Sequence, residues 1–109
     1  MPTKSLRILI ADADPEQALH IERTLNILGY YRIAPLYNPE ALVSLGNART
    51  AEYDVLLINQ EMAGVGIAEE DGFRRDNSQF RHVLFYADAD SFVNQLSGLM
   101  QALDTSPRP

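Results

Sequence analysis

Short apolar segments alternate along this chain with segments whose apolar residues recur at helical spacing. The first apolar segment, Leu6 to Ala11, is too apolar for a strand with one face in water, so it suits a sheet covered on both faces. Similar segments run from Tyr31 to Tyr37, from Asp54 to Ile58 and from His82 to Ala87. Strands that alternate with helices form parallel sheets with right-handed crossovers. The sequence therefore predicts an α/β domain.

The helix boundaries can also be predicted. Asp14 suits an N-cap before Pro15, Gln17 predicts a capping box, and Gly29 ends the first helix. A second helix is predicted from Asn38 to about Gly46. A last helix has the inward positions Phe92, Leu96, Leu99, Met100 and Leu103. Pro35 has no backbone N–H to donate to a neighbouring strand, so it predicts that its strand lies at an edge of the sheet. The glycine-containing region from Ala63 to Gln79 allows only a short helix over Ile67 to Arg75.

Length and composition restrict the functions that the chain can have. The 109 residues form one domain, predicted over 1–104, with 105–109 as a tail or the start of a linker. There is no cysteine, which excludes disulfides and thiolate metal sites. The net charge is -6, with no basic cluster longer than Arg74-Arg75, so direct nucleic-acid binding is not expected. The N-terminal apolar run is too short for a membrane span or a signal peptide, and we expect a cytoplasmic protein.

Polar residues follow the predicted strands. Asp12 and Asp14 follow the first strand, Asn59 to Glu61 the third, and Tyr86 lies near the end of the fourth. Ligands of parallel α/β sheets bind at the carboxyl ends of the strands. These residues are therefore the candidates for a site.

Three segments resemble the receiver domain of bacterial response regulators. These are ILIADADPEQ, with a hydrophobic strand before acidic residues, YDVLLINQEMAG, which is similar to the third-strand signature, and HVLFYADAD, which is similar to the fourth strand. The resemblance covers about the first ninety residues. It implies a CheY-like (flavodoxin-like) three-layer sandwich with a parallel sheet of four strands in the order 2-1-3-4, or a shortened five-stranded version.

The residues that carry receiver chemistry are changed. Asn59 stands where receivers have the aspartate that accepts a phosphoryl group, and a neutral amide lacks the nucleophilic carboxylate oxygen. Ala13 replaces one of two paired acids, and Asp14 is displaced by one residue onto the helix cap. Tyr86 replaces a small hydroxyl residue, so a bulky ring is expected in the pocket. We predict no catalytic residue, no metal site and no cofactor.

The sequence also lacks the fifth strand of a receiver and its lysine, since the only lysine is Lys4. Either the fold ends at four strands, or a strand and a helix are missing between the third strand and the last helix. In the second case HVLFYADADSFVNQL corresponds to the last strand and helix of the family. The Tyr-Ala ending of the strand favours the first alternative.

Two interpretations of the polar residues remain open. In the first, Asp12, Asp14, Glu61 and Tyr86 form a residual pocket around Asn59. In the second, Asp12 and Asn59 only hydrogen-bond nearby backbone groups at the strand ends, and Asp14 is a helix cap.

The predicted function is that of a phosphorylation-independent pseudo-receiver, a protein-interaction or dimerisation module in bacterial signal transduction. An unpaired fourth-strand edge would be covered by a second copy or by another protein. The predicted interface consists of Val83, Leu84, Phe85, Phe92 and Leu96. The alternatives are an atypical response regulator phosphorylated on another carboxylate, Asp12 or Asp14, and a pseudo-receiver that senses a small ligand over Asn59 and Tyr86.

Overall fold

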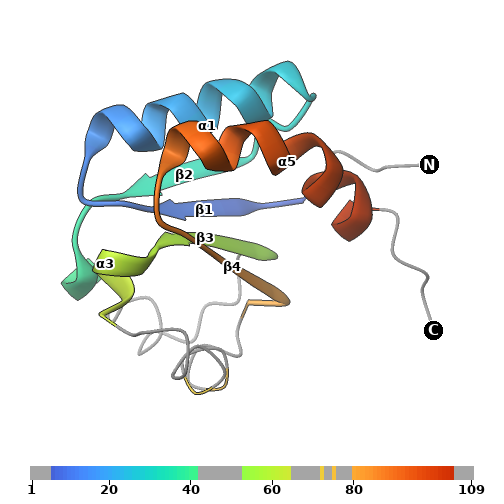
Figure 1. The fold of residues 1–109 in the computed structure, drawn as a ribbon. Coiled ribbons are helices and arrows are strands. Elements are labelled where there is room, and N and C mark those ends of the chain that lie inside the picture. Colours follow the sequence, from blue (N-terminus) through green and yellow to red (C-terminus); the bar gives the residue numbers. More distant parts are fainter. Residues whose placement is uncertain (1–5, 42–52, 65–71, 73–74, 76–79, 105–109) are drawn as a thin grey trace.

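The computed structural model describes residues 6–41, 53–64, 72, 75 and 80–104 (Figure 1). Its elements, in chain order, are β1 (Ile8–Ala11), α1 (Pro15–Ile27), β2 (Ile33–Leu36), β3 (Val55–Asn59), α3 (Gln60–Ala63), β4 (His82–Tyr86) and α5 (Ala89–Asp104). The predicted α/β class is confirmed. Most of the second predicted helix and of the helix predicted over Ile67 to Arg75 lies outside the described residues. No helix in the described ranges is both long and apolar enough to cross a membrane.

The four described strands form one all-parallel sheet in the order β2-β1-β3-β4. This is the predicted order 2-1-3-4. Pro35 lies in β2 at one edge, where its missing N–H breaks no ladder in the interior of the sheet. β4 is the outermost described strand at the other edge.

The two central strands are buried on both faces, which explains why their sequences are so apolar. Every residue from Ile8 to Ala11 and from Val55 to Ile58 is at most 1% exposed. Alternate side chains point to opposite faces, so Ile8, Ile10, Val55 and Leu57 pack on the side of α1 and α5, and their neighbours pack on the other side. The core is therefore divided by the sheet into two layers.

The last helix packs beside α1 on the same face of the sheet (Figure 1). The crossover from β1 to β2 runs toward one edge of the sheet through α1, and a right-handed crossover toward the other edge lies on the opposite face. A helix that led outward to a further strand beyond β4 would have to lie on that opposite face as well. Since α5 lies on the α1 face, it does not have the position of a right-handed crossover that leads outward from β4.

The start of α1 differs in one respect from the prediction. Asp14 is the N-cap and accepts a hydrogen bond from the Glu16 backbone N–H (2.9 Å), as expected. The predicted capping box is wrong, because the backbone N–H of Asp14 already donates to Asp12 Oδ1 (2.8 Å). The side chain of Gln17 instead accepts a hydrogen bond from the Ala89 backbone N–H (3.0 Å) and so links α1 to the first residue of α5.

Leu96 provides a test of how much α5 contributes to the core. It is 0% exposed, whereas Leu19 on α1 is 43% exposed. We expect Leu96→Ala to lower the free energy of unfolding by about 2–5 kcal/mol, since it removes a fully buried side chain and leaves a cavity. Urea denaturation measures this change, with Leu19→Ala as the control. Equal, small losses in both variants would show that α5 does not belong to the cooperative core.

Candidate functional site

Three polar side chains come together at the carboxyl edge of the sheet. Asp12 follows β1 directly, Asn59 is the last residue of β3 and Tyr86 is the last residue of β4. Asn59 and Tyr86 are register partners, and strand alternation puts Asp12 and both of these residues on the α1 and α5 side of the sheet. The structure thus brings together the residues that the strand ends predicted.

Asp12 is buried, with 2% of its surface exposed, and both of its carboxylate oxygens are hydrogen-bonded. The Tyr86 hydroxyl donates to Oδ2 at 2.6 Å, and the Asp14 backbone N–H donates to Oδ1 at 2.8 Å. A buried charge is costly unless such partners compensate it. The carboxylate of Asp12 is therefore fully engaged within the chain.

The side chain of Tyr86 lies across the end of β3. The strands β1 and β4 are not neighbours, since β3 separates them, and two strand spacings are about 10 Å. To reach Asp12, the phenol must pass over the carboxyl end of β3, where Asn59 is located. Burial, followed by the hydrogen bond to Asp12 and its negative charge, raises the pKa of Tyr86 above its usual range. The hydroxyl therefore stays protonated and acts as a neutral donor.

The aromatic ring of Tyr86 has a second contact, with α5. It stacks on the ring of Phe92 with centroids 4.8 Å apart and an angle of 15° between the planes. Both rings are buried, with 4% and 6% of their residue surface exposed. Tyr86 thus joins the polar strand ends to the helix that covers them.

Asn59 binds a nearby backbone group, as one of the two open interpretations predicted, and it does so as a helix cap. It is the N-cap of α3, and its Oδ1 accepts a hydrogen bond from the Glu61 backbone N–H (2.8 Å). Gly64, at a φ of 69°, ends this single turn. An asparagine followed by a glycine five residues later was the available signal, but one turn is too short to show apolar periodicity. Asn59 is only 6% exposed, whereas Asp14 and the carboxylate-bearing Glu61 are exposed.

No group of three or more His, Asp or Glu side chains in the described ranges is placed to hold a metal ion. Two acidic side chains at this edge cap helices. Asp14 caps α1. Asp88 caps the start of α5, where its carboxylate accepts hydrogen bonds from the backbone N–H (3.2 Å) and the hydroxyl (3.0 Å) of Ser91. The arrangement stabilises strand ends and helix starts.

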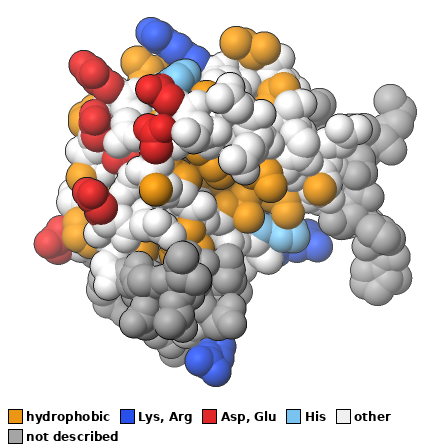
Figure 2. Space-filling model, viewed as in Figure 1, with side chains coloured by type: hydrophobic (Ala, Val, Ile, Leu, Met, Phe, Trp, Pro, Cys, Tyr) orange, Lys and Arg blue, Asp and Glu red, His pale blue; other side chains and the backbone are white. Residues whose placement is uncertain are grey.

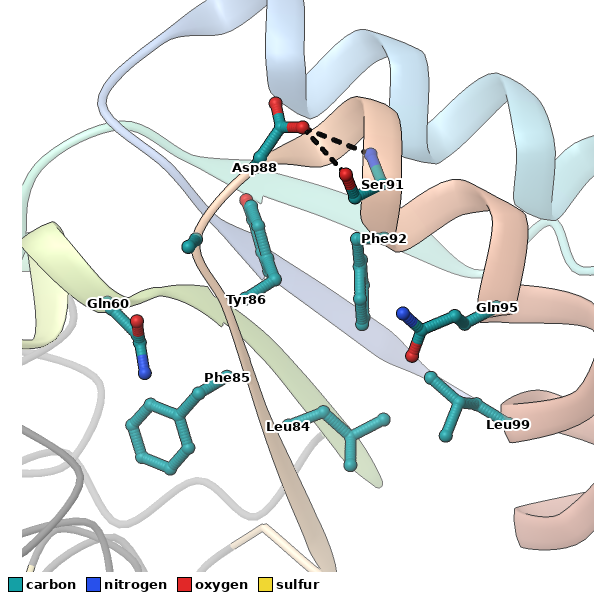
Figure 3. A pocket seen from close by; sticks show the side chains of 10 residues that line it. Gln60, Leu84, Phe85, Tyr86, Asp88, Ser91, Phe92, Gln95 and Leu99 are labelled. Atoms are coloured by element: carbon teal, nitrogen blue, oxygen red, sulfur yellow. Dashed lines mark hydrogen bonds between the residues drawn. The ribbon is translucent and has the colours of Figure 1, made fainter.

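A pocket of about 440 Å³ lies beside this cluster, between β4 and α5 (Figure 3). We call it the β4–α5 groove. Its lining consists of Gln60, Leu84, Phe85, Tyr86, Ala87, Asp88, Ser91, Phe92, Gln95 and Leu99. Tyr86 is thus part of the polar cluster through its hydroxyl and part of the groove through its ring.

The predicted interface residues divide between the core and this groove. Val83 (6% exposed) and Leu96 (0%) are buried in the chain, and they do not line the groove. Leu84 and Phe85 are half-buried and line it, and Phe92 forms part of its wall. A surface at this position would therefore be formed by Leu84, Phe85 and the exposed side of α5.

Comparison of the sequence with models of protein families gives no match, and comparison with curated proteins gives none either. The fold and the geometry of the site are therefore the basis for a functional proposal.

Tyr86→Phe tests the hydrogen bond on which the cluster depends. The variant leaves the ring stack in place but removes the donor to buried Asp12, and we expect a loss of about 1–3 kcal/mol in the free energy of unfolding. Tyr31→Phe, at a residue that is 72% exposed, is the matched control and should change little.

The same pair of variants gives a pH test. Because the pKa of Tyr86 is higher in the folded state, its contribution to stability is fully present below the unfolded tyrosine pKa of about 10 and is lost as the pH rises above that value. Urea denaturation from neutral to alkaline pH should show this loss in the wild type and in Tyr31→Phe, and less of it in Tyr86→Phe. Identical pH profiles for all three proteins would contradict the assignment.

Proposed function

We propose that this chain is a phosphorylation-independent, receiver-like domain that acts as a protein-interaction or dimerisation module in bacterial signalling, in the cytoplasm. One observation carries the proposal. The Tyr86 hydroxyl donates to Asp12 across the end of β3, so an internal hydrogen bond occupies the place at which a receiver would bind a cation and a phosphoryl group. The chain retains the architecture but uses its polar residues to hold one state.

The topology supports the relationship to receivers and favours one of the two alternatives for the missing strand. In a five-stranded sheet of the order 2-1-3-4-5, a helix between the fourth and fifth strands would lie on the face opposite α1. Here the helix after β4 lies beside α1. β4 and α5 therefore fit better as the last strand and helix of such a fold, with a strand and a helix missing before them, than as its fourth pair.

The β4–α5 groove supports an interaction function. It combines half-buried apolar side chains, Leu84, Phe85 and Leu99, with the amides Gln60 and Gln95 (Figure 3). Mixed surfaces of this kind, with an apolar centre and a polar rim, are typical of protein interfaces. A partner protein or a second copy of this chain at the groove would bury these side chains.

We expect the chain to associate through the groove, and a charge at Leu84 should weaken that association. Leu84→Glu introduces a carboxylate that an apolar contact would have to desolvate, which we expect to raise the dissociation constant at least tenfold. Light scattering over a concentration series measures self-association, with Leu19→Glu on the exposed side of α1 as the control.

Binding of a partner protein is measured with the same variants, by capture from a bacterial lysate. If Leu84→Glu leaves both self-association and partner capture unchanged, the groove is not the interface.

Phosphorylation on a different carboxylate is the alternative function, and a chemical test separates it. After incubation with a small phosphodonor and Mg²⁺, we expect the intact mass to stay unchanged, because Asn59 has no nucleophilic oxygen and both oxygens of Asp12 are engaged. An increase in mass by one phosphoryl group would contradict the proposal, and peptide mapping would then locate it on Asp12 or Asp14. A small ligand over Asn59 would have to displace the Tyr86 side chain.

A further inference from the structure

The β4–α5 groove has a charged end. Asp88 lines the groove where β4 ends, and its carboxylate is held at the start of α5 by the backbone N–H and hydroxyl of Ser91 (Figure 3). The side chain remains exposed. A ligand in the groove would therefore meet a fixed negative charge next to apolar side chains.

The surroundings add to this negative charge. The first turns and caps of the helices at the carboxyl edge contain the exposed acids Asp14, Glu16, Glu61 and Asp90. In the described ranges, three arginines, Arg7, Arg32 and Arg81, precede strands and so lie at the opposite edge. Figure 2 shows the acidic side chains gathered at one end of a central hydrophobic patch, with one basic and one histidine side chain close to them, and further basic and histidine side chains at the other end.

We propose that the β4–α5 groove binds a short cationic, amphipathic segment of another protein. Apolar side chains of that segment contact Leu84 and Leu99, and a lysine or arginine next to them faces Asp88. This inference rests on the proposed function and names the chemistry of the partner. A foreign segment fits better than a second copy, because two chains with a net charge of -6 each repel, whereas a cationic segment is attracted to the acidic edge.

The test starts from random linear peptides displayed on phage, selected against the wild-type chain at a concentration at which light scattering gives a monomer. The enriched peptides are expected to combine apolar residues with at least one lysine or arginine and to carry a net positive charge. Synthetic copies are then titrated against variants by fluorescence anisotropy.

Two pairs of variants locate the binding. Leu84→Glu should weaken binding more than tenfold, with Leu19→Glu as the control. Asp88→Asn keeps an acceptor for Ser91 but removes the charge, and should weaken binding about two- to fivefold, the size expected for an exposed ion pair. Glu16→Gln, at an exposed acid outside the groove lining, is its control and should have a smaller effect.

The outcomes separate this inference from the proposed function. If peptides bind and depend on Leu84 but show no cationic preference and no dependence on Asp88, the groove is an interface and the cationic partner is wrong. If no peptide is enriched, or if binding ignores Leu84→Glu, the inference is also overturned. If in addition Leu84→Glu does not change self-association or partner capture, the proposed function fails with it.

Discussion

The hydrogen bond from the Tyr86 hydroxyl to Asp12 connects two strands that are not neighbours, and the organisation of the carboxyl edge depends on it. It satisfies a carboxylate that is almost completely buried, and it places the phenol over the end of β3. Without this donor, Asp12 would keep, among the residues that the structure describes, only the backbone N–H of Asp14 as a hydrogen-bond partner. A buried charge with one partner missing is among the costliest defects in a small domain.

The same tyrosine determines the shape of the β4–α5 groove. Its ring stacks on Phe92 and so positions the first turns of α5 over β4. Two further contacts hold this end of α5 to α1, from Gln17 to the Ala89 backbone N–H and between His20 Nδ1 and Asp90 Oδ1 (3.1 Å). Contacts within the chain therefore set the position of α5 on the sheet.

The sequence predicted the fold better than it predicted the site. Strands and the last helix followed from continuous apolar segments and helical stripes, since each of these signals extends over several residues. The sheet order followed from the resemblance to receiver domains. The role of Gln17 did not follow, because its partner, Ala89, lies 72 residues further along the chain. The cap formed by Asn59 was missed because α3 has a single turn. Tyr86 was placed in the pocket, but its hydrogen bond to Asp12 depends on how three strand ends meet in space.

The residues at the carboxyl edge are consistent with one another. Like charges that lie close together in a buried place strongly oppose ionisation. Ala13 and Asn59 carry no charge, so Asp12 is the one buried carboxylate in the described part of this edge, and the neutral Tyr86 hydroxyl donates to it. An aspartate at position 59 would add a second buried charge at this edge. The amide of Asn59 avoids this cost and caps α3.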